Sequence, residues 1–234
     1  MESARDSRNP MTPKPDPLIV FLAYDGMTML DLIGPFEVLT MWPDATIRVA
    51  ARKAGVVSPD SRSLPVIASH ALRDLPQPDI IVIPGGPWPT EVPKLNEEIA
   101  WLTRAAPACR QIFSICTGSF LLAQAGLLRG RKATSHWAAL SGLSAFGAEP
   151  VTARYVEDGN ILTAAGVSAG IDAALALTAR WKDEEMAKAI QLMIEYDPKP
   201  PFNSGSPATC EPDVLLFLQG EQGKQLTARS KRTP

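Results

Sequence analysis

Cysteine and histidine are scarce in this sequence. Its 234 residues include three cysteines, Cys109, Cys116 and Cys210, and two histidines. The cysteines are too few and too scattered to form a disulfide framework, and no local Cys/His spacing resembles a zinc site. We therefore expect neither disulfides nor a metal centre, and this usage of cysteine fits a reducing cytoplasm best.

Charge of one sign and long apolar runs are missing as well. The formal net charge is −2 and the charged residues are dispersed, which argues against the basic field that dominates nucleic-acid binding. No apolar segment approaches the roughly 18 to 20 residues needed to cross a bilayer, and residues 1–17 contain no apolar run that could act as a secretory signal. We expect a small molecule as partner, with no nucleic acid and no membrane.

The composition favours one folded domain. Hydrophobic residues make up 45% of the chain, enough for a substantial core at a length that allows one domain or two small ones. Residues 1–17 combine Arg5, Arg8 and Lys14 with four prolines and indicate a disordered extension. We predict a single domain over residues 18–221 and a polar, solvated tail over 222–234.

Buried apolar runs alternate with segments of helical spacing along the rest of the chain. We expect strands at Leu18–Tyr24, Thr46–Ala51, Leu64–Ala68, Asp79–Ile83, Gln111–Ile115 and Lys132–His136, and a hairpin of Val151–Val156 and Ile161–Ala164. We expect helices within Met27–Trp42, where Gly34-Pro35 divides a turn from a helix, around Leu95–Leu102, and at Thr117–Leu128, Ser168–Trp181 and finally Asp183–Tyr196, before a Pro-rich loop over Asp197–Pro212. This order predicts an α/β fold with a mostly parallel sheet covered by helices on both faces, in which sites form at the carboxyl ends of strands.

Cys116 lies between a buried strand and the start of a helix. At that position unpaired backbone N–H groups and the helix dipole stabilise an anion, so the reactive thiolate becomes more populated at neutral pH. Gly118 and Ser119 permit a sharp turn and leave the sulfur approachable. Cys116 is the candidate nucleophile, with a buried structural thiol as the alternative. Cys109 and Cys210 do not open a helix, and we expect them to be structural.

Two further segments carry candidate chemistry. Pro84-Gly85-Gly86-Pro87 lets the backbone approach a ligand and offer an amide N–H, for which Gly86 is the donor because Pro87 has none. A Gly-Gly pair is, however, more often a simple turn. Asp31 stands among apolar neighbours, where burial would raise its pKa and make it a usable proton donor or acceptor. Helix capping is the equally weighted alternative for Asp31.

The two histidines offer little choice of a base. We expect His70 at the surface. His136, within Ala133–Trp137, ends an expected strand and could border the site, but a hydrogen-bonded structural role is favoured for it.

Together these segments resemble the isocyanide hydratases of the ThiJ/PfpI superfamily. The similarity runs from about Leu18 to Pro212. It includes the segments Leu30–Pro35, Ile83–Gly86, Cys116–Ser119, Ala125–Leu128, Ala133–Trp137, Ser168–Asp172, Glu195–Pro198 and Pro200–Asn203. The resemblance implies the class I glutamine-amidotransferase-like fold, a flavodoxin-like α/β sandwich, and a homodimer that needs no cofactor.

The resemblance also implies roles for particular residues. Cys116 would be the nucleophile, Asp31 the acid/base carboxylate and Thr117 a neighbour that orders the site. The Cys116 thiolate would attack the terminal carbon of R–N≡C to give a thioimidate, which water hydrolyses to an N-substituted formamide while Asp31 passes protons. The implied pocket or backbone-donor residues are Gly85, Gly86, Trp88, His136, Trp137, Ala165, Gly166 and Val167.

Residue types separate this chain from other members of the superfamily. Those acting as peptidases or on glyoxal-type adducts usually carry His directly after the cysteine and Glu near the first strand, where this chain has Thr117 and Asp31. No histidine follows His136, which disfavours a Cys-His-Glu glutaminase. Two departures from the hydratases, Trp88 after the Gly-Gly turn and Ala165 in a normally glycine-rich segment, add bulk near the expected pocket. They predict a narrower substrate range or altered movement of the cysteine loop.

Two other functions stay open. The thiolate could serve as an oxidation or electrophile sensor, as in some members of the superfamily. The chain could also be a non-catalytic ligand-binding domain like that of AraC-type regulators, although these append a helix-turn-helix region of roughly a hundred residues, more than the expected tail can hold. We rank hydration of an isocyanide first.

Overall fold

The computed structural model describes residues 16–60, 64–86 and 95–220. Its main sheet has seven strands in the order β10-β11-β7-β6-β1-β2-β5. In chain order these are β1 (Leu18–Leu22), β2 (Thr46–Ala51), β5 (His70–Ala71), β6 (Ile80–Ile83), β7 (Gln111–Ile115), β10 (Tyr155–Asp158) and β11 (Ile161–Ala164). Neighbouring strands are parallel except β10 and β11, which form an antiparallel hairpin. The expected α/β fold with a mostly parallel sheet is confirmed.

The central strands of the sheet are buried on both faces, as continuous apolar segments in parallel sheets are. Phe21 in β1, Ile81 in β6 and Phe113 in β7 are all 0% exposed. β2 and β5 follow β1 on one side, whereas β6, β7 and β11 extend the sheet on the other, so the direction of the chain across the sheet reverses between β1 and β6. In open α/β sheets, sites form at the carboxyl ends of strands beside such a switch point.

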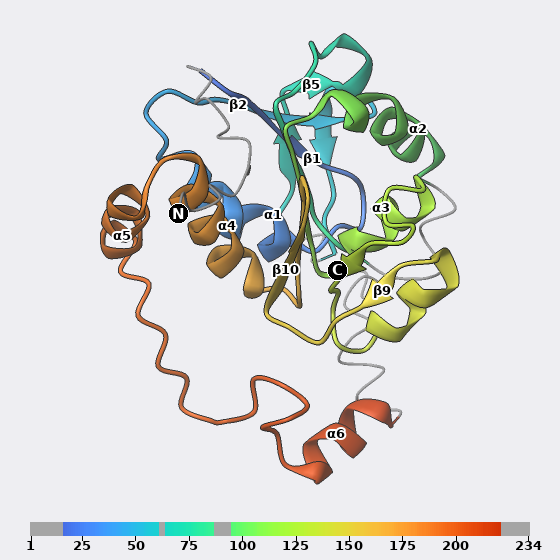
Figure 1. Cartoon of the computed structure of the whole chain (residues 1–234), viewed down its shortest axis with the longest axis vertical. Helices are drawn as coiled ribbons and strands as arrows, with labels where there is room; N and C mark the ends of the chain where they lie inside the picture. Colours follow the sequence, from blue (N-terminus) through green and yellow to red (C-terminus); the bar gives the residue numbers. More distant parts are fainter. Residues whose placement is uncertain (1–15, 61–63, 87–94, 221–234) are drawn as a thin grey trace, which may run out of the picture.

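Helices cover both faces of the sheet (Figure 1). α1 (Met29–Leu39) and α4 (Ala169–Trp181) lie on one side with α5 (Glu184–Met193) beyond α4, and α2 (Asn96–Ala105) and α3 (Ser119–Gln124) lie on the other. The short 3-10 helices are η1 (Leu72–Asp74), η3 (Ala106–Ala108), η4 (Cys116–Gly118) and η5 (Leu140–Phe146). Within the described parts of the chain, no helix is long and apolar enough to cross a membrane.

α1 runs unbroken through Gly34-Pro35, so the expected division of this segment is wrong. A proline inside a helix removes one backbone hydrogen bond. Close packing against α4 offsets that loss: a Cβ added to Gly170 would lie 3.2 Å from Pro35 Cδ. A Cβ added to Gly34 would likewise lie 3.1 Å from Ile171 Cγ1. The Gly-Pro pair therefore serves the contact between two helices.

Several other expected elements are shorter in the structure or belong to smaller sheets. The helix expected from Thr117 is η4 followed by α3, which ends at Gln124. The strand expected over Lys132–His136 is β8 (Lys132–Ala133), which pairs with β9 (Glu149–Pro150) outside the main sheet. The strand expected over Leu64–Ala68 is β4 (Val66–Ala68), which pairs with β3 (Gly55–Val57). These short strands lack the long apolar runs that mark the central sheet.

The chain continues past α5, so the expectation that this is the final helix is wrong. An extended arm leads to α6 (Pro212–Gln219), which projects from the body of the molecule (Figure 1). No residue of α6 is buried, and Leu216 and Phe217 are 64% and 46% exposed. The Pro-rich loop expected over Asp197–Pro212 agrees with this arm up to the first residue of α6.

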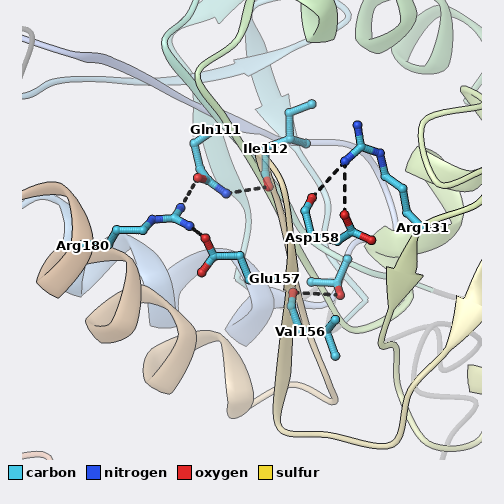
Figure 2. A network of polar contacts seen from close by, with 8 residues as sticks. Gln111, Ile112, Arg131, Val156, Glu157, Asp158 and Arg180 are labelled. Carbon is cyan, nitrogen blue, oxygen red and sulfur yellow. Dashed lines mark hydrogen bonds and ion pairs between the residues drawn. The ribbon is translucent and has the colours of Figure 1, made fainter. Parts of the chain in front are cut away.

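A network of polar contacts holds the edge hairpin at the end of the sheet where β7 begins (Figure 2). Arg180 of α4 contacts both Gln111 at the start of β7 and Glu157 of β10. Arg131 donates to the Asp158 carbonyl at 3.0 Å and lies 3.5 Å from its carboxylate. Because Cys116 follows the opposite end of β7, this network stabilises the hairpin away from the candidate site.

Candidate active site

Cys116 directly follows β7, in the middle of the sheet. Its φ of 57° is left-handed, a conformation that costs a non-glycine residue roughly 1–2 kcal/mol. Its amide N–H donates to the Ala165 carbonyl after β11, at 2.9 Å. The turn also needs Gly118, because a Cβ there would lie 2.4 Å from the Ile83 carbonyl oxygen. The tight turn leaves Cys116 at the carboxyl end of the sheet with 5% of its surface exposed.

Asp31 comes from the first turn of α1 and does not cap the helix. The N-cap residue is Thr28, and it makes no side-chain capping bond. Asp31 is 0% exposed, and its Oδ2 accepts the Gly85 N–H at 2.9 Å. Its other oxygen, Oδ1, is buried without a hydrogen-bond partner among the described residues. The capping alternative is therefore wrong, and one carboxyl oxygen is free to take a proton.

Thr117 and the Gly85-Gly86 turn hold each other. The Gly86 N–H donates to Thr117 Oγ1 at 2.9 Å, and the Thr117 hydroxyl donates to the Gly86 carbonyl at 2.7 Å. A Cβ added to Gly85 would lie 2.6 Å from the Thr117 amide nitrogen and 2.9 Å from Asp31 Oδ2. The structure thus uses both glycine N–H groups internally, whereas the sequence suggested that Gly86 would donate to a ligand.

Burial governs the protonation of Asp31 and Cys116. It raises the pKa of the Asp31 carboxyl from 3.8 to about 7, although the Gly85 N–H and the nearby Cys116 side chain lower it. Burial and the charge of Asp31 raise the pKa of the Cys116 thiol well above its ordinary value, outweighing the backbone N–H groups of Val167 and Thr117. The raised pKa of Asp31 agrees with expectation. The expected populated thiolate is wrong, because desolvation exceeds the effect of the turn's N–H groups.

The segment after β11 forms the wall beside Cys116. Ala165 accepts the Cys116 N–H through its carbonyl, and the Val167 N–H lies close enough to the sulfur to lower the thiol pKa. Val167 has a φ of 26°. A Cβ added to Gly166 would lie 2.8 Å from His136 Cδ2, so this glycine allows His136 to approach the wall.

His136, in the segment after β8, borders the same wall, and Trp137 lies beside its ring. Their ring centroids lie 5.5 Å apart, and Trp137 is 41% exposed. His136 Nδ1 accepts the Ala138 N–H at 3.3 Å, and burial lowers the pKa of His136 below 6.5. A neutral, locally hydrogen-bonded ring matches the structural role favoured from the sequence. Trp88, the remaining expected pocket residue, lies outside the described residues.

Three side chains whose hydrogen bonds the sequence did not predict support this site. The Tyr24 hydroxyl donates to the Pro84 carbonyl at 2.8 Å and so holds the start of the Gly-Gly turn. Ser119 and Ser135 both donate to the Cys116 carbonyl. Tyr24 ends the first apolar run, and its position at a strand end was the one signal available beforehand. Within the described ranges, no group of three or more His, Cys, Asp or Glu side chains is placed to hold a metal ion.

Comparisons with known proteins find similar sequences and structures. A model of the DJ-1/PfpI family matches residues 18–180. The chain is 38% identical over 215 residues to an isonitrile hydratase from Pseudomonas putida, across 92% of this chain and 94% of that protein. It is 35% identical to the crystal structure of a ThiJ/PfpI family protein from Pseudomonas syringae, with a TM-score of 0.84 over 99% of this chain and 98% of that one.

A regulator shares part of the same similarity. The HTH-type transcriptional regulator GbdR from Pseudomonas aeruginosa is 30% identical over 201 residues. The match covers 82% of this chain but 52% of the regulator.

Proposed function

The chain belongs to the DJ-1/PfpI family, and from this we propose that it is an isonitrile hydratase. The reaction would add water to an isonitrile, R–N≡C, and release an N-substituted formamide. Similarity to the isonitrile hydratase from Pseudomonas putida supports the reaction class. The observation that carries the proposal is the buried pair of Cys116 and Asp31, in which the thiol adjoins a carboxyl that ionises near neutral pH.

The first step would join Cys116 to the substrate. The Asp31 carboxylate accepts the thiol proton while a sulfur lone pair forms a bond to the terminal carbon of R–N≡C. Asp31 then returns the proton to that carbon, which gives the thioimidate S–CH=N–R. The carboxyl suits both transfers, because a group with a pKa of about 7 gives and takes protons readily near neutral pH.

The second step would release the product. Water adds to the thioimidate carbon, and Asp31 accepts one proton from that water and passes it to the imine nitrogen, which gives the adduct S–CH(OH)–NH–R. As the hydroxyl of this adduct becomes the carbonyl, its proton passes through Asp31 to the departing Cys116 sulfur, and R–NH–CHO leaves. The net reaction consumes one isonitrile and one water and leaves Cys116 and Asp31 as they began. Thr117 would keep the Gly86 turn and the Asp31 carboxyl in place through its two hydrogen bonds to Gly86.

A non-catalytic binding domain is the second candidate, and similarity to the regulator GbdR is the observation in its favour. An oxidation sensor has less support. Oxidation of cysteine proceeds through the thiolate, and burial disfavours that form of Cys116.

Formamide production tests the proposal against both alternatives. Wild-type protein would be incubated with an aryl isonitrile while the N-aryl formamide is measured by chromatography. We expect turnover by wild type, a loss of about 10³-fold or more for Cys116→Ala, and a loss of about 10²–10⁴-fold for Asp31→Asn. Cys109→Ala serves as the matched control, because Cys109 is also a buried thiol but donates hydrogen bonds to the Pro78 and Ala105 carbonyls. We expect this variant to keep the wild-type turnover.

Two outcomes would reject the hydratase. One is no formamide from wild-type protein. The other is equal turnover by wild type and Cys116→Ala when circular dichroism shows both to be folded. Binding of the isonitrile without product would favour the binding domain instead.

A further inference from the structure

The Cys116 carbonyl is an unusually well-bound group at the centre of the site. It accepts the Ser135 hydroxyl at 3.0 Å and the Ser119 hydroxyl at 3.2 Å. Both serines are buried, with 1% and 0% of their surfaces exposed. A buried hydroxyl needs a hydrogen-bond partner, but two of them converging on the carbonyl of one residue suggest that its orientation matters.

That carbonyl shares a rigid peptide plane with the amide of Thr117. In a trans peptide the C=O and the following N–H point in opposite directions. Fixing the Cys116 oxygen on one side therefore directs the Thr117 N–H to the other. The Thr117 nitrogen lies only 2.6 Å from where a Cβ on Gly85 would stand, and no such atom is there. This N–H lies at the glycine turn and within hydrogen-bonding reach of the Cys116 sulfur, whose pKa it lowers.

The two serines differ in what they connect. Ser119 lies in the same turn as Cys116, so it moves with the peptide that it binds. Ser135 comes from the segment after β8, which is fixed independently: the Thr134 N–H donates to Thr163 Oγ1 at 2.8 Å, and the Thr134 hydroxyl donates to the Ala153 carbonyl at 3.2 Å. Ser135 therefore ties the strained turn to the neighbouring β10–β11 hairpin.

We propose that Ser135 is a positioning residue that, through the Cys116 carbonyl, holds the Cys116–Thr117 peptide so that the Thr117 N–H faces the Cys116 sulfur. In this position the N–H stabilises negative charge on the sulfur as the thiol loses its proton. A second consequence is that the left-handed conformation of Cys116, with φ at 57°, is held from outside the turn. The effect on isonitrile turnover rests on the proposed function, whereas the effect on thiol reactivity does not.

Alkylation of Cys116 tests the proposal without any isonitrile. Wild type, Ser135→Ala and Ser135→Thr would be treated with iodoacetamide over a range of pH, and modification of the Cys116 peptide followed by mass spectrometry. Ser135→Ala is expected to slow alkylation about tenfold at each pH below the thiol pKa, because an N–H no longer held in place stabilises the anion less well. Ser135→Thr keeps the hydroxyl and is expected to restore most of the rate.

Ser114→Ala is the matched control. Ser114 lies in β7 two residues before Cys116, is 0% exposed, and its hydroxyl has no hydrogen-bond partner among the described residues. Ser114→Ala removes a buried hydroxyl near the site but leaves both hydrogen bonds to the Cys116 carbonyl in place, so its rate of alkylation should match that of wild type. If Ser135→Ala and Ser114→Ala alkylate alike, Ser135 is only a structural serine and the proposal is overturned.

Two further measurements separate the positioning role of Ser135 from a loss of folding and from a failure of the proposed hydratase activity. Should Ser135→Ala fail to fold, Thr134→Val keeps the side-chain shape but removes the hydroxyl bond to the Ala153 carbonyl that anchors the Ser135 segment, and the proposal then requires slower alkylation of Cys116 in that variant; a wild-type rate overturns it. If the wild type produces no formamide while Ser135→Ala still alkylates slowly, the hydratase fails and the positioning role stands. If the wild type produces formamide and Ser135→Ala alkylates at the wild-type rate, the hydratase stands and the positioning role fails.

Discussion

At the scale of single residues, Asp31 and Cys116 share an environment in which burial decides where the proton sits. Asp31 is fully buried and keeps one oxygen with no hydrogen-bond partner among residues 16–60, 64–86 and 95–220, and its pKa rises to about 7. The thiol next to it is held neutral. The reactive form of the site is therefore a thiol beside a carboxylate, and Asp31 has to be ionised before Cys116 can lose its proton to it.

This arrangement predicts how the rate depends on pH. Below about pH 7 Asp31 is protonated and cannot accept the thiol proton, so kcat/KM for an isonitrile should fall about tenfold for each pH unit below its pKa. Initial rates of formamide formation, measured from about pH 5 to about pH 8, test this fall in kcat/KM. A profile that stays flat down to about pH 5 would show that Asp31 is not the proton acceptor.

Asp31 also predicts a change of stability with pH. Its pKa is higher in the folded chain, about 7, than its ordinary value of 3.8, so the folded state binds a proton more tightly than the unfolded state. The stability that this protonation contributes is complete below about pH 4 and is lost as pH rises through about 7. Asp31→Asn carries no charge at any pH.

The free energies of unfolding of wild type and Asp31→Asn, measured in urea at about pH 5 and about pH 8, check this account. The free energy of unfolding of Asp31→Asn, relative to that of wild type, should increase by on the order of 2–4 kcal/mol from the lower to the higher pH. Parallel pH dependence in the two proteins would contradict a raised pKa for Asp31.

At the scale of elements, the turn from β7 into α3 depends on the absence of a side chain at Gly118. Its conformation is ordinary, with φ at −57°, so an alanine would fit the backbone. The space does not admit it, because a Cβ would lie 2.4 Å from the Ile83 oxygen and 2.8 Å from the Pro84 oxygen. β6 and the start of α3 touch here through backbone alone.

Gly118→Ala should therefore destabilise the protein by about 1–3 kcal/mol, the usual cost of overpacking. Thermal unfolding followed by circular dichroism measures the effect. Gly205→Ala is the matched control, because no atom in the described part of the chain lies within 4 Å of a Cβ built at Gly205. An equal effect of the two substitutions would mean that the turn has room to relax.

Local signals in the sequence were enough to find some of these elements and not others. The central strands follow from continuous apolar runs, and Cys116 at a strand end followed by Gly118 marked the candidate nucleophile. The unbroken α1 could not be foreseen, because Pro35 is tolerated through its packing on Gly170 of a distant helix. The order of the strands, which brings Asp31 next to Cys116, is likewise set by tertiary pairing.

The protonation of the site escaped prediction for the same reason. The sequence shows that Cys116 opens a turn rich in N–H groups, which favours the thiolate. It does not show how deeply the sulfur is buried or that Asp31 adds a negative charge beside it, and these effects prevail. Ser135 was quoted only as part of a family segment, because its partner, the Cys116 carbonyl, is a backbone group that leaves no mark in the sequence.

At the scale of the whole molecule, the C-terminal arm exposes more apolar surface than an isolated chain would be expected to keep in water. Val214, Leu216 and Phe217 of α6 are 37%, 64% and 46% exposed, and an eight-residue helix is not stable by itself. The ThiJ/PfpI family protein from Pseudomonas syringae matches across 99% of this chain, so the arm lies within the length that the two proteins share. We propose that a second copy of the chain covers this surface, in the homodimer that family resemblance implies.

Light scattering after size-exclusion chromatography tests this expectation. Wild type should have twice the chain mass of 25.2 kDa, whereas a double variant, Leu216→Glu with Phe217→Glu, should be monomeric. Gln219→Glu is the control, because it adds charge to the same helix without altering an apolar side chain. A monomeric wild type, or a dimer that survives the double variant, would contradict the assignment of α6 to the interface.

The covalent step is the centre of the account, and the intact mass of the protein during turnover tests it most directly. Wild type mixed with an aryl isonitrile and quenched in acid at short times should gain the full mass of one isonitrile, because thioimidate formation is an addition without a leaving group. Peptide mapping should place that mass on Cys116. Formamide production with no such adduct at any time, or an adduct on Cys109 or Cys210 instead, would contradict the account.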